Sequence, residues 1–598
     1  MRGIISKRVT NPYRTKNIQM KNRSLQTLAL ALITVVGFTA CTGLGKLVKN
    51  ANKITYKVTP NPMEMHGDSI QVTITGTYPA KIFPKKATVT TIPVIKYNGG
   101  EKALKPVVLI GEKVTGVQGQ KIANKTGGNF SYTSDKVAYI PEMKVATLEV
   151  RVGGQVKSKK KDLPAKKVAD GTIITPLLVK SDDKAIVGKD EFKKVVPHSE
   201  TANIFFIVNQ SQVRGTELNS AEMKSFKQYV AAATVNPNIA FKNMNVSAYA
   251  SPDGELTLNT DLAENRAKEA TKAMEAMFKD KKTKVDAAQK DEFYNKVTTA
   301  EDWDGFKKAM EASSIADKDL ILRVLTMYPD GETREKEIKN LSKTYTVVAD
   351  KILPQLRRAV LTLNVEVKSR TDEQISKLAA STPDSLSVEE ILYAATLTQD
   401  INAKLDIYKK AEAKYGSDWR TSNNVGMILL IQNKLNDAEA EFKKADGLSA
   451  NNPVIKNNLG IVARWKGDRK AAMDLYKSAI SAGPEVSYNM GIVEIQNGNY
   501  PSAVANFGGD NSFNAALAKL LNGNSEGAMS TIDKAADKDA ALSFYLKAIA
   551  GARQSKADVL TNNLKVAIQK DASFKQMAKE DAEFIKFRDN ADFKALTN

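Results

Sequence analysis

Side chains that could perform acid–base or nucleophilic chemistry are few and scattered in this sequence. It holds one cysteine, Cys41, and two histidines, His66 and His198. Ser251 has no histidine nearby, so the sequence suggests no catalytic triad. Neither a phosphate-binding glycine loop nor a histidine-based zinc motif is present. Acidic pairs such as Asp182-Asp183 are ordinary in a chain with 26% charged residues. The sequence therefore predicts a protein that is not an enzyme and needs no cofactor or metal.

The sole cysteine follows a segment that is typical of an export signal. Lys21 and Arg23 precede an uncharged stretch of 14 residues at 25–38, which is too short for a membrane-spanning helix. Residues 38–41, Phe-Thr-Ala-Cys, resemble the lipobox of bacterial lipoproteins, with Phe in the usual Leu position. We expect residues 1–40 to be a leader and signal peptide, Cys41 to be acylated, and 41–53 to form a tether. The alternative is an ordinary signal peptide with a chance cysteine.

An acyl anchor at Cys41 would determine the location of the protein. Each buried CH₂ contributes about 0.8 kcal/mol, so several chains hold a protein firmly on a bilayer. Residues 42–50 carry no acid, whereas the surface-export signals of some lipoproteins are acidic. We therefore expect a protein that is lipid-anchored in the cell outer membrane and faces the periplasm.

The region that follows has the pattern of an all-β domain. The chain of 598 residues predicts three to five domains at roughly 150 residues each. Residues 70–74 and 145–152 alternate apolar and polar side chains, and Asn98-Gly99-Gly100 marks a turn. We expect a basic β-sandwich domain over 54–199.

Much of the net charge of +21 lies in this part of the chain, because residues 41–200 hold 27 Lys and Arg against 14 Asp and Glu. The densest cluster is Lys157-Ser158-Lys159-Lys160-Lys161. One interpretation is a solvated loop, and the other is contact with phosphate headgroups or an acidic partner beside the membrane. Nucleic acid is disfavoured as a partner because the chain carries an export signal.

Strand and helix patterns alternate from about residue 200 to 370. Short apolar runs at 204–208, 245–249 and 359–367 predict strands, and amphipathic stretches at 220–233 and 262–278 predict helices. This order implies an α/β sandwich with its helices on one face.

The stretch from Ser247 to Ala270 resembles the OmpA-like, peptidoglycan-associating domain. The motif matches are Gly254, Asn259, Leu262, Arg266 and Ala267. The resemblance spans nearly all of 200–370, with a helical insertion at roughly 280–345.

The OmpA-like family grips diaminopimelate of peptidoglycan with one aspartate and one arginine. Arg266 falls on the arginine position, but the aspartate position holds Ser251. A serine cannot neutralise an ammonium group, and this loss should cost roughly 1–3 kcal/mol of binding. Asp253 is the alternative acid, although its place on a turn would direct it elsewhere. The resemblance makes Arg266, Ser251, Asp253, Gly254 and Asn259 candidates for peptidoglycan binding; alternatively the domain is a docking module with Arg266 in a structural ion pair.

The helical remainder, 371–598, contains a repeat of 34 residues that resembles the tetratricopeptide repeat. Each unit has a glycine, then an alanine at +12 and an aromatic residue at +16. We expect the small residues to let paired helices approach closely, and the aromatic ring to fill the gap toward the next unit. The repeat-packing residues are Gly426, Ala438 and Phe442; Gly460, Ala472 and Tyr476; and Gly491, Ala503 and Phe507.

Asparagines recur beside the repeat glycines. Asn423, Asn424, Asn457 and Asn458 could line a concave groove and bind an extended peptide backbone; as surface or capping residues they would have no such role. The fold class is thus multidomain: an all-β sandwich, an α/β OmpA-like domain and an all-α tetratricopeptide solenoid. We expect a tether between the outer membrane and peptidoglycan that scaffolds a protein partner in the repeat groove. The alternative is an accessory subunit of an outer-membrane assembly or secretion complex that does not bind peptidoglycan.

Overall fold

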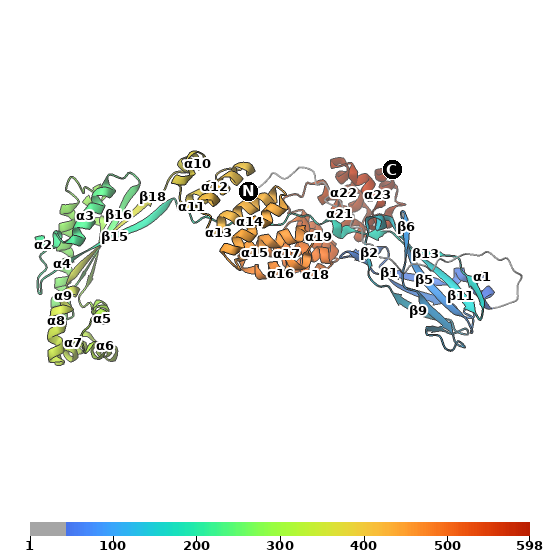
Figure 1. Ribbon diagram of the computed structural model, residues 1–598, viewed down its shortest axis with the longest axis horizontal. Helices are drawn as coiled ribbons and strands as arrows, with labels where there is room; N and C mark the ends of the chain where they lie inside the picture. The colour runs from blue at the N-terminus through green and yellow to red at the C-terminus, as the bar shows by residue number, and fades with distance from the viewer. Residues whose placement is uncertain (1–42) are drawn as a thin grey trace. The chain divides into compact units, whose positions relative to one another are not determined.

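A computed structural model of the chain describes residues 43–598, so the expected leader and the acylation of Cys41 lie outside the described residues. The chain folds into two compact units, labelled by element in Figure 1. The first comprises 43–179, Gln496–Asn499 and Asn511–Asn598, and the second comprises Lys180–Ile495 and Tyr500–Asp510.

The amino-terminal part of the first unit is mainly β-sheet, built from three sheets with the orders β1-β4-β9, β10-β3-β2-β14 and β12-β11-β5-β7-β8. In β11 (Thr147–Val156) buried and partly exposed side chains alternate along most of the strand, so one face of the strand packs on the core. The other strands are β1 (Thr55–Thr59), β2 (Met63–His66), β3 (Ser69–Ile70), β4 (Thr73–Tyr78), β5 (Thr88–Tyr97), β6 (Gly100–Ala103), β7 (Val107–Gly111), β8 (Gln120–Ile122), β9 (Gly128–Thr133), β10 (Val137–Ala138), β12 (Lys159–Asp162), β13 (Lys166–Asp170) and β14 (Thr172–Ile173).

The last helices of the chain belong to this same unit, although the sequence pattern placed them in one solenoid with all residues from 371 onward. Lys144 pairs with Glu580 at 2.8 Å, and the side chain of Thr175 donates a hydrogen bond to Glu583. These contacts join the β region to the carboxyl-terminal helices, which are α19 (Phe513–Leu521), α20 (Ser525–Ile532), α21 (Ala541–Arg553), α22 (Ala557–Lys570), α23 (Ser573–Glu580) and α24 (Ala591–Thr597).

The second unit begins with an extended linker, Lys180–Lys194, and then forms an α/β domain. Its sheet has the order β15-β18-β16-β17, in which β16 and β17 are parallel and the other pairs are antiparallel. The expected boundary at residue 199 falls inside the first strand. The strands are β15 (Val195–Phe205), β16 (Ile239–Tyr249), β17 (Tyr294–Thr299) and β18 (Arg358–Lys368), and the helices are α2 (Gly215–Leu218), α3 (Ala221–Thr234) and α4 (Leu256–Met277).

The expected helical insertion at 280–345 is wrong for its first part, because β17 lies there and pairs with β16. The run Tyr-Asn-Lys-Val-Thr-Thr has an exposed polar face and few apolar side chains, so the apolar pattern of a strand is weak. Five helices follow and enclose a small core of their own around Phe306, Met310 and Ile338. They are α5 (Trp303–Ala312), α6 (Lys318–Met327), α7 (Gly331–Asn340), α8 (Ser342–Lys351) and α9 (Leu353–Leu356).

A helical repeat solenoid completes the second unit. In each full repeat the aromatic ring covers the glycine of its own repeat, where an added Cβ would lie 2.8 Å from Phe442, 2.5 Å from Tyr476 or 2.7 Å from Phe507. The ring therefore fills the space that the glycine leaves open between the two helices of its own repeat. The helices are α10 (Asp372–Ser381), α11 (Val388–Ala394), α12 (Ile401–Lys414), α13 (Trp419–Ile431), α14 (Leu435–Leu448), α15 (Pro453–Trp465), α16 (Arg469–Ser478), α17 (Pro484–Asn497) and α18 (Tyr500–Phe507).

Among the helices of residues 43–598, none is long and apolar enough to cross a bilayer.

Candidate binding groove

The linker Lys180–Lys194 runs in extended form against the first helices of the repeats, where α13, α15 and α17 present their asparagines. Ile186 is buried in the solenoid core cluster, with Ala185 and Phe192 partly buried against it. The groove that the asparagines were expected to line is therefore filled, within this unit, by a segment of the same chain.

Three successive repeats each contribute one asparagine that binds the backbone of one linker residue, and the three bound residues are two positions apart. The amide oxygens of Asn489, Asn458 and Asn424 accept hydrogen bonds at 2.7–2.9 Å from the N–H groups of residues 184, 186 and 188. The Nδ2 groups of the same asparagines donate to the carbonyl oxygens of those same residues at 2.8–3.0 Å. This two-residue period is that of an extended chain, in which alternate residues share one face.

A second row of asparagines supports the first. Asn423 donates to the carbonyl oxygen of Ile186 at 3.2 Å, and Asn457 donates to that of Lys184 at 3.0 Å. The rows also bond to each other, because Asn458 donates to Asn423 and Asn489 donates to Asn457, both at 2.9 Å. All five side chains are at most 1% exposed. A buried amide left without a partner is costly, so this network fits a polypeptide backbone in the groove.

Side chains fix the register of the linker at its start. The Asp183 carboxylate accepts hydrogen bonds from Arg464 Nε at 2.6 Å and Trp465 Nε1 at 2.7 Å, and it also pairs with Arg464 Nη2. Its side chain is fully buried, and that of Arg464 is 3% exposed. The ammonium of Lys184 lies 3.7 Å from the ring centroid of Tyr488. A buried charge pair of this kind requires both partners, so a slipped register would leave one charge uncompensated.

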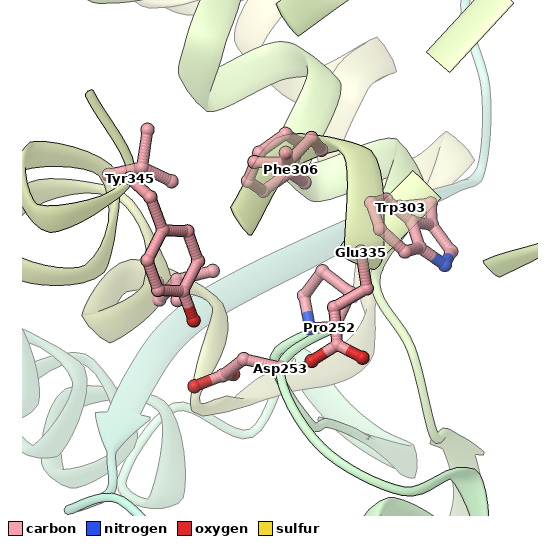
Figure 2. Close-up of a pocket in the computed structure, with 9 residues that line it drawn as sticks. Pro252, Asp253, Trp303, Phe306, Glu335 and Tyr345 are labelled. Atoms are coloured by element: carbon pink, nitrogen blue, oxygen red, sulfur yellow. The ribbon is translucent and has the colours of Figure 1, made fainter. Parts of the chain in front are cut away.

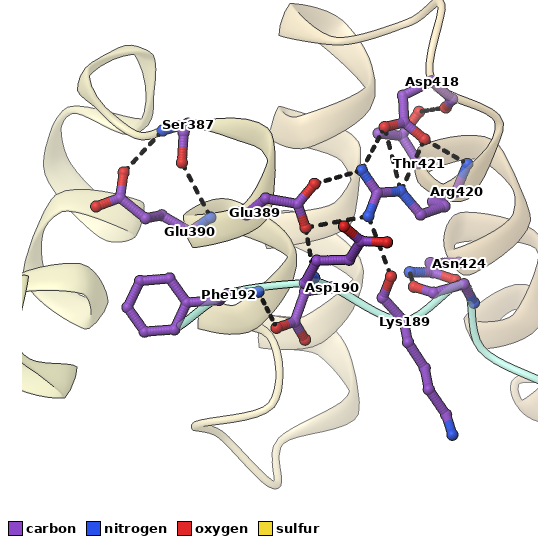
Figure 3. A network of polar contacts seen from close by, with 12 residues as sticks. Lys189, Asp190, Phe192, Ser387, Glu389, Glu390, Asp418, Arg420, Thr421 and Asn424 are labelled. Atoms are coloured by element: carbon purple, nitrogen blue, oxygen red, sulfur yellow. Dashed lines mark hydrogen bonds and ion pairs between the residues drawn. The ribbon is translucent and has the colours of Figure 1, made fainter. Parts of the chain in front are cut away.

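Arg420 holds the far end of the linker (Figure 3). Its guanidinium donates to the carbonyl oxygen of Lys189 at 3.1 Å and to both carboxylate oxygens of Glu389 at 2.7 and 3.0 Å. Glu389 in turn accepts the N–H of Glu191 at 2.5 Å. The hydrogen bond from Arg420 lowers the pKa of Glu389 below its usual value, so this carboxylate stays charged. The same figure shows the expected capping box that starts α11 at Ser387.

The linker then joins the solenoid to the α/β domain. The rings of Phe192 and Tyr393 stack with centroids 4.5 Å apart, and Lys194 pairs with Asp372 at 2.8 Å. Where the chain leaves the α/β domain, Arg370 pairs with Glu390 at 2.8 Å. Both ends of the domain are thereby attached to the first helices of the solenoid.

The candidate peptidoglycan residues of the α/β domain are bound to one another or to their own fold. Arg357, which precedes β18, donates to Ser251 Oγ at 3.0 Å and to Asp253 Oδ2 at 3.1 Å. The side chains of Arg357 and Asp253 are 11% and 17% exposed. Ser251 and Asp253 therefore point to the same guanidinium, which the sequence analysis did not select.

The helical insertion covers the loop at this position. Figure 2 shows Trp303, Phe306, Glu335 and Tyr345 of the insertion gathered over Pro252 and Asp253 around a small pocket. Glu335 accepts a hydrogen bond from the N–H of Gly254 at 2.7 Å. Gly254 has a φ of +130°, a conformation that favours glycine. The amide of Asn259 is directed to the Gly254 carbonyl at 3.4 Å.

Arg266 is 1% exposed and donates to three backbone carbonyl oxygens, at residues 207, 210 and 249. In the part of the chain that the structure describes, no carboxylate pairs with it. Burial lowers the pKa of Arg266 to about 10, with the charge of Arg357 acting in the same direction and that of Asp253 opposing it. The guanidinium holds the loops around β16 together, and each of its three nitrogens donates to a backbone carbonyl oxygen.

The sequence did not predict that the linker would fill the asparagine groove. The stretch Asp182 to Lys194 has no glycine–proline signature and no motif, so it was counted as part of the β domain. The sequence feature that could have revealed the bound segment lies in α13, α15 and α17. Each of these helices carries a buried asparagine at the same repeat position, and such a series implies a bound backbone. Over 43–598 no group of three or more His, Cys, Asp and Glu side chains is placed to hold a metal ion.

Comparisons with known proteins point to helical repeats. No protein-family profile matches the chain. The BBSome complex member BBS4 of Bos taurus is 23% identical over 206 residues, which are 34% of this chain and 39% of that protein, so the chain spans about two fifths of its length. A tetratricopeptide repeat protein from Parabacteroides merdae matches 35% of this chain and 90% of its own, at 13% identity and a TM-score of 0.28. YrrB, described as a TPR protein with an unusual peptide-binding site, matches 35% of this chain and all of its own, at 18% identity and a TM-score of 0.21. Repeat proteins of the tetratricopeptide type are among the structural neighbours of this chain.

Proposed function

We propose that this chain is a non-enzymatic scaffold of the bacterial envelope that assembles protein partners around its repeat solenoid. The observation that carries this proposal is the helical repeat solenoid, whose asparagine network already holds one extended backbone through eight hydrogen bonds to residues 184, 186 and 188. Solenoids of stacked helical hairpins are extended binding surfaces. The export signal and Cys41 support an anchor on the periplasmic side of the outer membrane.

The partner meets the solenoid outside the asparagine groove. The linker fills the three repeats that carry the asparagines, so a partner segment there would first have to displace residues 183–192. The bound linker instead joins the α/β domain to the solenoid. Two modules held on one chain raise the effective concentration of whatever each of them binds.

A scaffold that also binds peptidoglycan has less support than one that binds only protein partners. A diaminopimelate group would have to compete with Arg357 for Asp253 and with Glu335 for the Gly254 loop. Arg266 would also have to give up its carbonyl partners, each worth about 1 kcal/mol or more to a charged donor. We therefore favour the scaffold that does not bind the cell wall.

Affinity purification tests the proposal. Tagged full-length protein is crosslinked in cells and purified from detergent-solubilised membranes, with a tagged unrelated lipoprotein as the control. We expect a reproducible set of co-purifying envelope proteins, and recovery of the chain alone would contradict the scaffold function. A sacculus pull-down accompanies it: saturable retention that Asp253→Asn abolishes would assign the tether function instead.

A further inference from the structure

The first described helix, α1 (Gly43–Lys49), is fastened to the β region of the first unit. Leu44 and Leu47 are fully buried beneath it. A Cβ added at Gly154 of β11 would lie 2.9 Å from Leu44 and 3.6 Å from Leu47, so α1 packs directly on this strand. The outward face of the helix carries Lys46 and Lys49, both exposed.

The lysine-rich segment that the sequence analysis singled out is the β11–β12 hairpin beside α1. Within the hairpin, Lys161 pairs with Gly154, and Lys159 pairs with Val156. Cross-strand partners project to the same face of a sheet, and Gly154 faces α1. Lys159 and Lys161 therefore flank α1 on the face that it covers, and both are exposed.

These lysines form one patch of uncompensated positive charge, which we name the basic patch: Lys46, Lys49, Lys159 and Lys161. Within residues 43–598, no carboxylate lies at ion-pair distance from any of the four, and α1 itself contains no acid. Lys144 and Lys167 of the same unit, by contrast, each have a carboxylate within 3.0 Å. Four unpaired charges on one face repel each other, and an anionic surface would relieve that repulsion.

We propose that the basic patch binds the phosphate headgroups of an anionic phospholipid bilayer. The patch starts at Gly43, two residues after Cys41, so an anchor there would bring it to the membrane; in this respect the inference rests on the proposed envelope location. Several like charges on one exposed face suit a surface of diffuse negative charge better than one specific ligand. Each lysine near an anionic bilayer contributes about 1 kcal/mol, and salt screens the attraction.

Vesicle binding of the full-length chain tests this inference. Cys41→Ser removes any acyl chain from the comparison, and binding is measured by co-sedimentation with phosphatidylcholine vesicles that contain or lack phosphatidylglycerol. The patch variant replaces Lys46, Lys49, Lys159 and Lys161 by Gln. The matched control replaces four other exposed lysines, Lys279, Lys281, Lys282 and Lys284, by Gln.

We expect the patch variant to bind phosphatidylglycerol vesicles at least about tenfold more weakly than the control variant, with the difference shrinking at high salt. Equal affinities of the two variants, or equal binding to vesicles without phosphatidylglycerol, would overturn the inference. Protection of the patch lysines from acetylation on isolated envelopes, but not on protein-free vesicles, would assign an acidic protein partner and also overturn it. The mass of the amino-terminal peptide tests acylation of Cys41 separately, so failure of the anchor is distinguishable from failure of the patch.

Discussion

Asn424 and Gly188 exchange two hydrogen bonds. The N–H of Gly188 donates to Asn424 Oδ1 at 2.7 Å, and Asn424 Nδ2 donates to the Gly188 carbonyl oxygen at 2.9 Å. A Cβ built on Gly188 would lie 2.9 Å from Arg420 Cβ and 3.0 Å from its Cα. The linker backbone therefore approaches α13 so closely that only glycine fits at this position.

We expect Gly188→Ala to lift the linker from the groove at this point. Crowding against the Arg420 backbone should destabilise the second unit by about 1–3 kcal/mol, because the clash involves atoms that cannot move aside freely. Trypsin should then cleave after Lys184 or Lys189 faster than in the wild type, which mass spectrometry of timed digests would show. Gly447→Ala is the control, because a Cβ at this helical position meets nothing within 4 Å. Digestion of Gly188→Ala at the rate of that control would refute the close contact.

Asn458→Leu should remove the centre of the asparagine network. It loses both bonds to Ile186 and the bonds to Asn423 and Asn457. The N–H of Ile186 and the Oδ1 of Asn423 are then left buried without the partner they have in the wild type. At about 0.5–1.5 kcal/mol for each bond, we expect a loss of roughly 2–4 kcal/mol. Thermal unfolding followed by circular dichroism measures it. Asn402→Leu on the exposed face of α12 should change stability by less than about 0.5 kcal/mol; similar shifts for the two variants would show that the network is unimportant.

Asp183→Ala should be among the most damaging single changes in the linker. The substitution removes the carboxylate that pairs with Arg464, and it leaves the guanidinium, which is 3% exposed, as an unpaired buried charge. Breaking a buried pair from one side costs about 3–5 kcal/mol. Asp474→Ala breaks an exposed pair with Lys470 and should cost less than about 1 kcal/mol. Chemical denaturation of both variants gives the comparison, and equal midpoints would argue against a fixed register at Asp183.

Glu441 gives the second unit a pH dependence that can be measured. Burial raises the pKa of Glu441 from 4.5 to about 7, and the neighbouring carboxylate of Glu412 adds to this shift. A raised acid pKa favours the protonated folded state, so the unfolded chain loses its proton first and stability falls as the pH rises from about 4.5 to about 7. Glu441→Gln should therefore raise the melting temperature at pH 8 and leave it nearly unchanged at pH 4. An equal effect at both pH values would contradict the shift.

The parts of the fold with strong local patterns could be predicted from the sequence. The 34-residue repeat marks the solenoid because Gly426, Gly460 and Gly491 each accept an aromatic ring, and the capping box at Ser387 marks a helix start. Strand β17 could not be predicted, because its exposed polar face hides the apolar alternation.

Long-range relationships were harder to predict. The asparagine positions indicated a bound backbone, but nothing in residues 182–192 identified them as the segment that binds. Arg357 was overlooked as the partner of Asp253, because their contact depends on how β18 begins beside the loop after β16. The sequence resemblance assigned Arg266 to a ligand, whereas the structure shows its donors on backbone carbonyls.

Residue-resolved hydrogen exchange of residues 183–192 tests directly whether the linker lies in the asparagine groove. The amides of residues 184, 186 and 188 donate to asparagines, whereas in the described chain those of 185, 187 and 189 donate to no acceptor. We predict an alternating pattern in which the first three amides exchange slowly and the other three exchange fast, and in Asn458→Leu the amide of residue 186 should join the fast group. Uniformly fast exchange across the linker in the wild-type protein would contradict the account.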